Sequence, residues 1–169
     1  MWWLAGVVVV VAVVGTYVTW TASRVERLHA RAADAEVALV GKLNMRAKAA
    51  LLLAETESER LGRYAEAVRV AGHASLDSLA EEREAAENDL TRVLRELPLP
   101  ITDESMEEVR RANRRVAVAK QVHTDVVRDA LAIRFGVVAR LFRLTRHLPQ
   151  PKYFNIDDPA LSGGLDPNR

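Results

Sequence analysis

An uncharged stretch at the start of the chain is the feature that most constrains its structure. No Asp, Glu, Lys, Arg or His occurs from Trp2 to Trp20, and Val7 to Val11 is a continuous run of valine. At about 1.5 Å a residue, a helix over this stretch extends about 28 Å, which matches the hydrocarbon thickness of a bilayer. Tryptophan and tyrosine flank the stretch, where the headgroup level favours amphipathic rings. The sequence therefore predicts a transmembrane helix over residues 2–20.

Two other kinds of segment also contain long apolar stretches. A secretory signal peptide starts with basic residues and ends at small ones, whereas no basic side chain precedes this run. Cleavage after Ala22 would also put the bulky Trp20 where a signal peptidase requires a small residue. A buried core helix rarely stays uncharged over this length. We therefore expect an uncleaved, single-pass anchor.

The charges beside the anchor indicate its orientation. Arg24, Arg27 and Arg31 follow the apolar stretch directly, whereas only the α-amino group precedes it. Basic residues near a span tend to stay in the cytoplasm. We expect a cell-membrane protein with a short N-terminus outside and a cytoplasmic body. The reverse topology is the alternative, because three arginines make a modest bias.

The rest of the chain has the composition of a helical domain. Lys and Arg number 24 against 23 Asp and Glu, and there is no Cys. This balance provides no overall positive field for nucleic acid, and a chain without thiols fits either side of a membrane. Ala, Leu, Glu and Arg favour helices, and no strand-like alternation bounded by turns occurs. We expect an all-α domain over residues 23–148.

Apolar residues recur at helical spacing through the first half of this domain. One seam runs from Val25 to Leu43, and a second helical run extends from Ala47 to Val70. Weak helix formers separate the two runs only at Gly41 and Asn44. The pattern is consistent with one long helix and with two helices joined by a tight turn.

Two serine–glutamate pairs have the spacing of a capping box, in which a hydroxyl and a carboxylate satisfy backbone donors at a helix start. Ser78 with Glu81 is expected to begin one helix, after Gly72 has closed the previous one. Ser105 with Glu108 is expected to begin the last long helix. These signals divide the body into helices with short connections.

Prolines mark the ends of the helical body. Pro98 and Pro100 are expected to end the helix that starts near Ser78, because proline lacks an amide donor. Short links between amphipathic helices favour antiparallel neighbours, so we expect an up-and-down, coiled-coil-like bundle of three long or four shorter helices. Residues 149–169 contain prolines and the Gly163–Gly164 pair, and we expect an irregular or disordered tail.

Patterns that carry catalysis or metal binding are not found in the sequence. Glu26 with His29 is the only Glu-x-x-His pair, whereas a di-iron bundle needs two. The other histidines are dispersed and lack the paired spacing of zinc ligands. Glycine-rich phosphate loops and serine-nucleophile motifs are also missing. We expect no enzymatic activity, no cofactor, no metal ion and no small-molecule substrate. The dispersed histidines are His73, His123 and His147.

One histidine falls in an apolar seam. His123 lies between Val116 and Ala130 at heptad spacing in the last helix. The favoured interpretation is an imidazole at the edge of the seam with one hydrogen-bond partner. A pH-sensitive packing switch is the alternative, because burial of a charged imidazole is costly.

Two charged stretches are expected to lie on solvated surfaces. An acidic stretch runs from Glu81 to Asp89, including Glu87, and a basic one runs from Arg110 to Arg115 on the next helix. The two could pair weakly at the surface. The basic stretch lacks the interleaved aromatics of a nucleic-acid site, so we expect no nucleic-acid partner.

A basic amphipathic segment near the end of the body could bind lipid. Residues 134–148 mix arginines with aliphatic residues, a composition suited to an anionic leaflet. The alternative is a last helix that packs on the bundle with its charges in water. The candidate lipid-binding residues are Arg140, Phe142, Arg143 and Arg146.

The order of these features resembles the LemA family of bacterial membrane proteins over nearly the whole chain. The most specific segments are Ala86-Glu87-Asn88-Asp89-Leu90 and Arg115-Val116-Ala117-Val118-Ala119-Lys120-Gln121, with Leu43-Asn44-Met45-Arg46-Ala47 before them and Ala139-Arg140-Leu141-Phe142 after them. The chain departs from the family pattern at Leu51, where the family usually has proline, and at Val122 and His123, where it has an aromatic pair. The resemblance implies an N-terminally anchored antiparallel bundle of four helices, with no established enzymatic activity.

These features together predict a membrane-tethered helical scaffold. Such a protein would bind other membrane-associated proteins or itself through its helical faces, with the lipid bilayer as its other partner. The alternative is a peripheral lipid-sensing or membrane-remodelling protein that acts through residues 134–148.

Overall fold

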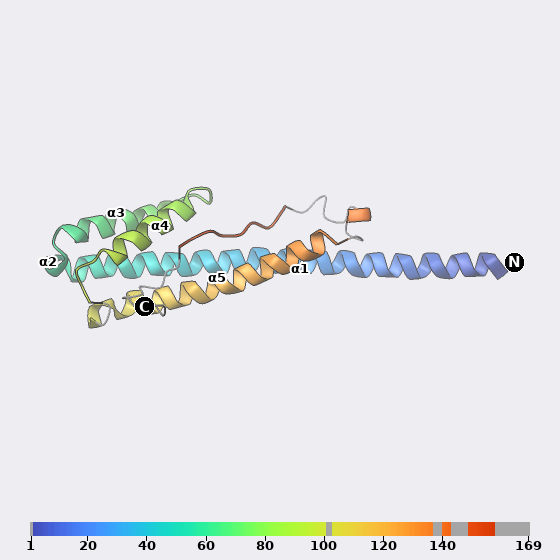
Figure 1. Cartoon of the computed structure of the whole chain (residues 1–169), viewed down its shortest axis with the longest axis horizontal. Helices are drawn as coiled ribbons and strands as arrows, with labels where there is room; N and C mark the ends of the chain where they lie inside the picture. Colours follow the sequence, from blue (N-terminus) through green and yellow to red (C-terminus); the bar gives the residue numbers. More distant parts are fainter. Residues whose placement is uncertain (1, 101–102, 137–139, 143–148, 158–169) are drawn as a thin grey trace, which may run out of the picture. The chain divides into compact units, whose positions relative to one another are not determined.

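The computed structural model describes residues 2–100, 103–136, 140–142 and 149–157, and its regular elements are all helical. Figure 1 shows their order along the chain. This confirms the expected all-helical class. The elements are α1 (Trp2–Thr56), α2 (Ser58–Leu61), α3 (Arg63–Asp77), α4 (Arg83–Arg95), the 3₁₀ helix η1 (Glu104–Met106) and α5 (Glu107–Arg134).

Helix α1 is continuous from Trp2 to Thr56, so the chain does not break at Gly41. The helical run expected from Ala47 to Val70 is interrupted instead after Thr56, and Gly62 adopts a φ of 53°, in the left-handed region that favours glycine. The last turn before this interruption still buries Leu53. Of the two alternatives, the first helix is continuous past Gly41 and Asn44, but it ends at Thr56 and does not extend to Val70.

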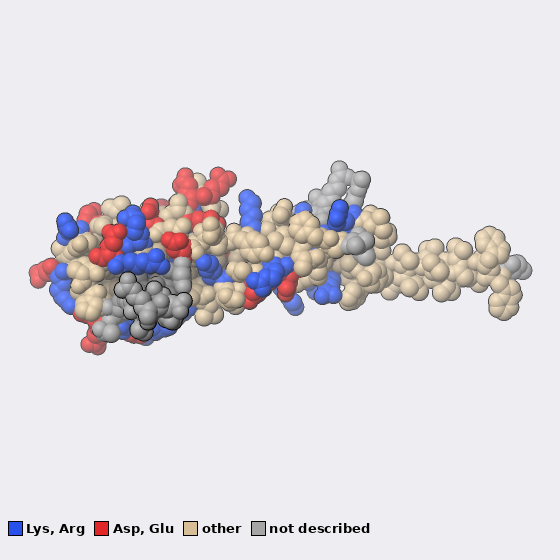
Figure 2. All heavy atoms as spheres, viewed as in Figure 1, with Lys and Arg blue, Asp and Glu red and all other residues tan. Residues whose placement is uncertain are grey.

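The first part of α1 is apolar and exposed. It makes α1 the one helix among the described residues that is long and apolar enough to span a membrane. Figure 2 shows this part without Lys, Arg, Asp or Glu on the visible face. Its threonine hydroxyls bond within the helix: Thr16 Oγ1 donates to the Ala12 carbonyl and Thr21 Oγ1 to the Tyr17 carbonyl, each at 2.8 Å. These bonds satisfy the polar groups without water, as a lipid environment requires.

The first expected capping box is wrong. Helix α3 continues through Gly72 and ends at Asp77, and α4 begins only at Arg83. Ser78 closes α3 instead of opening the next helix, because its Oγ donates to the Ser75 carbonyl at 2.9 Å. The terminal carbonyls of α3 thus compete successfully for the hydroxyl that was expected to cap α4.

The second expected capping box is also wrong. Asp103 caps the start of η1 and accepts from the Ser105 amide at 3.0 Å and from Ser105 Oγ at 2.6 Å. Arg60 Nη2 donates to the other carboxylate oxygen at 2.6 Å. The Arg60 hydrogen bond, together with those from Ser105, holds the pKa of the Asp103 carboxyl well below its usual range. The earlier carboxylate therefore takes the role expected of Ser105 with Glu108.

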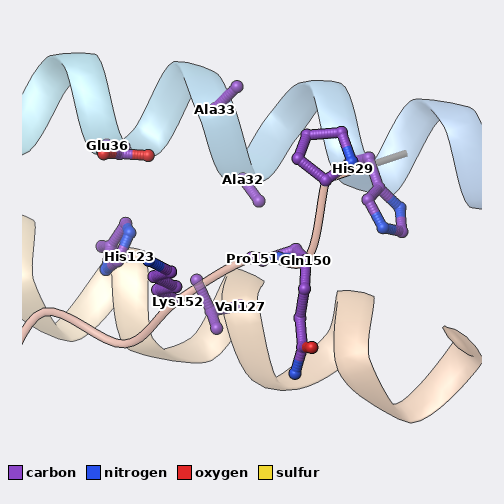
Figure 3. A pocket seen from close by; sticks show the side chains of 10 residues that line it. His29, Ala32, Ala33, Glu36, His123, Val127, Gln150, Pro151 and Lys152 are labelled. Atoms are coloured by element: carbon purple, nitrogen blue, oxygen red, sulfur yellow. The ribbon is translucent and has the colours of Figure 1, made fainter. Parts of the chain in front are cut away.

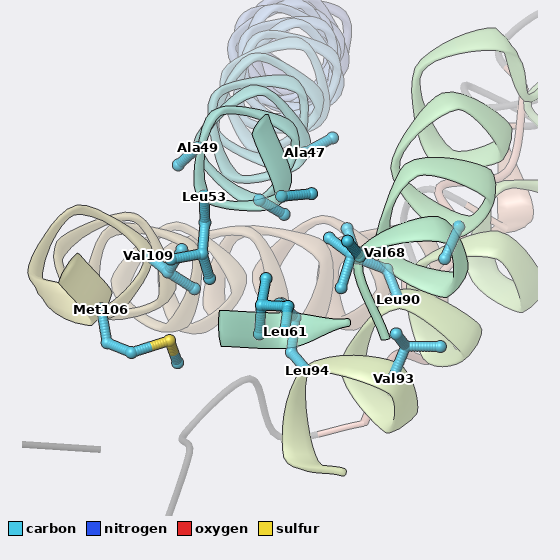
Figure 4. Close-up of a cluster of buried hydrophobic side chains, with 14 of the residues drawn as sticks. Ala47, Ala49, Leu53, Leu61, Val68, Leu90, Val93, Leu94, Met106 and Val109 are labelled. Carbon is cyan, nitrogen blue, oxygen red and sulfur yellow. The ribbon is translucent and has the colours of Figure 1, made fainter. Parts of the chain in front are cut away.

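The chain forms two compact units, one from residues 1–36 and 123–153 and the other from residues 37–122 and 154–169. In the second unit, α3 and α4 lie side by side along the last part of α1 (Figure 1). Side chains from all the helical elements of this unit point toward a common centre, as Figure 4 shows for Leu61, Val68 and Leu90. This cluster is the main apolar core.

Two smaller clusters complete the packing. In the second unit, Leu39 and Leu43 of α1 pack with Val116 of α5 and with Ile156, which is 3% exposed. Ile156 belongs to residues 149–157, which contain neither helix nor strand. In the first unit, Ala32 of α1 packs with apolar residues of α5. These are Val126, Val127, Ala130 and Leu131.

Substitutions at Gly72 and Gly41, which both lie in the second unit, are expected to change the free energy of unfolding in opposite directions. A Cβ on Gly72 would lie 2.9 Å from Leu51 Cγ, whereas a Cβ on Gly41 would meet nothing within 4 Å. Gly72→Val should therefore cost about 1–3 kcal/mol through overpacking. Gly41→Ala should stabilise the helix by about 0.5–1 kcal/mol, because alanine loses less backbone entropy. Urea unfolding of the full chain in detergent, followed by far-ultraviolet circular dichroism, measures both; two changes of the same sign would contradict this packing.

Candidate functional site

A buried ion pair connects α1 to α4 in the second unit. The side chains of Arg46 and Glu87 are 0% and 1% exposed, and Arg46 Nη2 lies 3.5 Å from Glu87 Oε2. The same nitrogen donates to the Glu87 carbonyl at 3.0 Å and to Thr91 Oγ1 at 2.7 Å. Ser75 Oγ of α3 donates to Glu87 Oε1 at 2.5 Å. Side chains from three helices therefore form one polar cluster inside the apolar core.

Burial sets the electrostatics of this cluster. It lowers the pKa of the Arg46 guanidinium from its usual value, the nearby Glu87 carboxylate opposes that shift, and Arg95 adds to it. Within the described part of the chain, Arg46 Nε, Arg46 Nη1 and Glu87 Oε2 have no hydrogen-bond partner. Each charge therefore depends on the other, because a buried charge without its counterion is costly. The cluster joins α1, α3 and α4 to one another through buried polar contacts.

The sequence contained a signal for this pair that the interpretation of its charges missed. Glu87 was assigned to a solvated acidic stretch, but it is buried, so that assignment is wrong. Arg46 stands at helical seam spacing between the buried Leu43 and Leu53, and Glu87 stands three residues before the buried Leu90. Opposite charges at seam positions of two helices are the pattern that predicts a buried pair.

The basic stretch of α5 pairs with its own helix. Arg110, Arg111 and Arg114 each form an ion pair with Glu107. Arg111 also lies 3.5 Å from Glu108. These contacts follow the one-turn and two-turn spacing of a helix and are individually weak. These ion pairs neutralise part of the positive charge of the basic stretch from Arg110 to Arg115.

A groove of about 400 Å³ lies between α3 and α4. Val70 stands in it and is 62% exposed, among alanines of α3. The rim is charged: Arg92 pairs with Asp89 at 3.1 Å and with Glu96 at 3.7 Å. The remaining lining residues are Glu66, Ala67, Ala71, Ala74 and Val93.

The chemistry of this groove suits a protein helix better than a polar small molecule. Protein interfaces typically have an apolar centre surrounded by a polar rim. Small residues on the floor allow a helix to approach closely, since the distance between packed helices depends on the side chains at the contact. The rim contributes three carboxylates and one guanidinium, so it favours a partner with basic flanks.

A second cavity, of about 190 Å³, lies in the first unit. His29 and Glu36 of α1 line it together with His123 of α5, and residues 149–152 pass across it (Figure 3). His29 Nδ1 lies 2.9 Å from the Val25 carbonyl, whereas His29 Nε2 and His123 Nδ1 are buried without a partner among the described residues. His123 is 2% exposed, so the structure places it inside the packing and not at the seam edge.

The protonation of His123 should make folding sensitive to acid. Burial lowers the pKa of the His123 imidazole, and Glu36 opposes this shift. The folded state therefore favours neutral His123, so its contribution to stability is complete above the unfolded pKa of about 6.5 and is lost as the pH falls below it. We expect His123→Leu to reduce the loss of unfolding free energy between about pH 7.5 and about pH 5.5.

Denaturant unfolding at the two pH values, followed by circular dichroism, checks this expectation. His73→Leu is the control, because His73 is exposed on α3. The same pH dependence in the native chain and in His123→Leu would contradict the role of His123.

The residues expected to bind lipid are described only in part. Arg140 and Phe142 are exposed, and the Arg140 amide donates to the Gly136 carbonyl at 3.1 Å. Arg143 and Arg146 lie outside the described residues. The segment 134–148 therefore contributes exposed apolar area at Leu141 and Phe142, which are 72% and 45% exposed.

No group of three His, Asp or Glu side chains within the described ranges could hold a metal ion. Comparison of the chain with protein-family models, curated proteins and solved structures found no match.

Proposed function

We propose that the chain is a membrane-anchored helical scaffold that binds a protein partner through the groove between α3 and α4. The exposed apolar centre of this groove, around Val70, is the observation that carries the proposal. The body has no catalytic role in this account. Its partner is another membrane-associated protein or a second copy of the chain.

The anchor is supported by the start of α1. Large apolar side chains there are exposed in the protein, for example Val9 at 60% and Val13 at 62%. Exposed valine over this length is unfavourable in water and favourable in a bilayer. Arg24, Arg27 and Arg31 favour a cytoplasmic body with the short N-terminus outside. The proposed location is therefore the cell membrane, with one pass.

The proposed arrangement of the body is an antiparallel up-and-down bundle of the LemA type. The resemblance to that family includes the segments that contain Arg46 and Glu87, and these two residues form the buried pair. A pair that joins separate helices explains why both segments would carry a charge at a seam position. LemA-like membership is part of this proposal and rests on the sequence segments alone.

The groove favours a helical partner with small or aliphatic residues facing Val70 and basic residues beside the rim. Helix-in-groove binding places an apolar stripe of the partner in the groove, and the rim charges set its direction and register. The pairs of Arg92 with Asp89 and Glu96 are exposed, so a partner can compete for these carboxylates at little cost.

Replacing Val70 with aspartate tests the function. Full-length chain is captured from gently solubilised membranes, and self-association is measured by sedimentation in detergent. We expect a stoichiometric protein or a dimer, and at least about a tenfold loss of binding in Val70→Asp, since a charge buried at an interface is costly. Val118→Asp is the matched control, because Val118 is 65% exposed on α5 outside the groove.

Three results would count against this proposal. The first is recovery of the chain as a monomer without a stoichiometric partner. The second is a partner or dimer that survives Val70→Asp undiminished. The third is an equal loss in Val118→Asp, which would place the interface elsewhere.

A further inference from the structure

A second groove, of about 540 Å³, lies in the first unit directly after the apolar stretch of α1. Trp20, Arg24, Arg27 and Arg31 line it from α1. Their spacing of four, three and four residues places them on one face of the helix. The other lining residues are Leu28 on α1 and Asp129, Ala132 and Ile133 on α5.

The arginines of this groove are available to a ligand. Arg24, Arg27 and Arg31 are exposed, and no carboxylate in the described part of the chain forms an ion pair with any of them. The Arg24 guanidinium lies over the Trp20 ring, 5.6 Å from its centroid. This contact directs one cation toward the aromatic ring that ends the apolar stretch.

The position of the groove along α1 matches the headgroup layer of a bilayer. Trp20 ends the uncharged stretch, and tryptophan favours the headgroup level. From Arg24 to Arg31 the helix rises about 10 Å. The headgroup region adds about 5–7 Å on each side of the hydrocarbon core. Arg24, Arg27 and Arg31 lie about 6, 10 and 16 Å beyond Trp20 along the helix axis. Arg24 therefore lies within the headgroup layer, the side chain of Arg27 extends back to it, and Arg31 lies on its aqueous side.

We propose that this groove binds the headgroup of an anionic phospholipid in the leaflet beside the body. Guanidinium groups bind phosphate through paired N–H donors, so Arg24 and Arg27 can hold the phosphodiester, and Arg31 is available to an outer polar group of the same headgroup. Leu28 and Ile133 add apolar surface to the lining of the groove. The inference rests on the anchor in the proposed function and is independent of the α3–α4 groove.

Asp129 is expected to lower the affinity of this groove for an anionic headgroup. Among the described residues, it is the one carboxylate that lines the groove, and it is exposed. A carboxylate repels an anionic headgroup, so it should limit affinity while leaving neutral lipid unaffected. Arginines that act only as a topology signal would have no reason to respond to Asp129.

Native mass spectrometry of the full-length chain in detergent tests the proposal by titration with phosphatidylglycerol and with phosphatidylcholine. We expect one phosphatidylglycerol to bind about tenfold more tightly than phosphatidylcholine. Arg27→Gln should weaken phosphatidylglycerol binding about fivefold, which corresponds to the contribution of one basic residue near an anionic surface. Asp129→Asn should tighten it by about twofold or more.

The matched control replaces Arg111, Arg114 and Arg115 with glutamine, which removes three positive charges of α5 outside the groove. This variant should bind phosphatidylglycerol as the native chain does. Equal affinity of the native chain for the two lipids would overturn the inference, and so would an unchanged preference in Arg24→Gln/Arg27→Gln/Arg31→Gln. Displacement of the lipid by an equal concentration of inorganic phosphate would assign the site to free phosphate instead.

Failure of the anchor gives a different result from failure of this site. A chain that leaves membranes without detergent has no anchor, whatever its lipid affinity in micelles. A chain that stays in membranes but shows no preference for phosphatidylglycerol retains its anchor and lacks the site.

Discussion

Glu87→Leu is expected to destabilise the body by about 3–5 kcal/mol, because it removes the counterion of the buried Arg46. The Arg46 guanidinium would retain its bonds to the residue 87 carbonyl and to Thr91 Oγ1, but these neutral acceptors do not balance its charge. This loss is a large fraction of the stability of a typical domain. Urea unfolding in detergent, followed by circular dichroism, measures it. Tryptophan fluorescence would not, since all three tryptophans lie at or before Trp20.

The double variant Arg46→Leu/Glu87→Leu separates the pair from the loss of either side chain. Replacing a buried ion pair by apolar residues is often neutral or stabilising, so the double variant should recover most of the stability lost in Glu87→Leu. Asp89→Asn is the control, because Asp89 is exposed and its variant should unfold with little change. Single effects that simply add in the double variant would contradict the coupling of Arg46 to Glu87.

Val9→Arg/Val13→Arg is expected to release the chain from membranes. Both valines are exposed near the middle of the uncharged stretch. Each arginine near the centre of a span costs about 2.5–3.5 kcal/mol on the insertion scale, so the two together cost about 5–7 kcal/mol. Apolar residues each return only about 0.3–0.6 kcal/mol on the same scale. Membrane flotation of the variant should therefore recover most of the chain in the soluble fraction.

Val37→Arg is the matched control for this change. Val37 is also on α1 and is 73% exposed, but it lies beyond the uncharged stretch. The control should float with membranes as the native chain does. If Val37→Arg were released to the same extent, a part of α1 other than the uncharged stretch would have to anchor the chain.

Apolar periodicity was sufficient to predict the helical class, but it left open whether the first helix continues past Gly41. The uncharged stretch and the seam from Val25 to Leu43 both have the period of a helix, and that signal is strong over long segments. The helix ends were not predicted correctly. The Ser78 hydroxyl can bond backbone groups of α3 or of α4, and it donates to the Ser75 carbonyl of α3. Asp103 directly precedes η1 and caps it, whereas the expected cap, Ser105, lies inside η1.

The buried ion pair and the two grooves were not predicted from the sequence, because each is formed by segments that lie apart in it. Arg46 and Glu87 are separated by 41 residues, and each is ambiguous alone because charged residues usually face water. The α3–α4 groove depends on how closely two helices pack, which spacing within one helix does not specify. The arginines after Trp20 were recognised as a topology signal. Their shared groove with Asp129 became visible only when α5 was placed beside α1.

The central claim is that the opening part of α1 crosses a lipid bilayer. Alkaline carbonate extraction of membranes that contain the unmodified full-length chain tests this claim most directly, because high pH removes peripheral proteins and leaves spanning helices in place. The account predicts that the chain stays in the membrane pellet. Its release into the carbonate supernatant would contradict the claim.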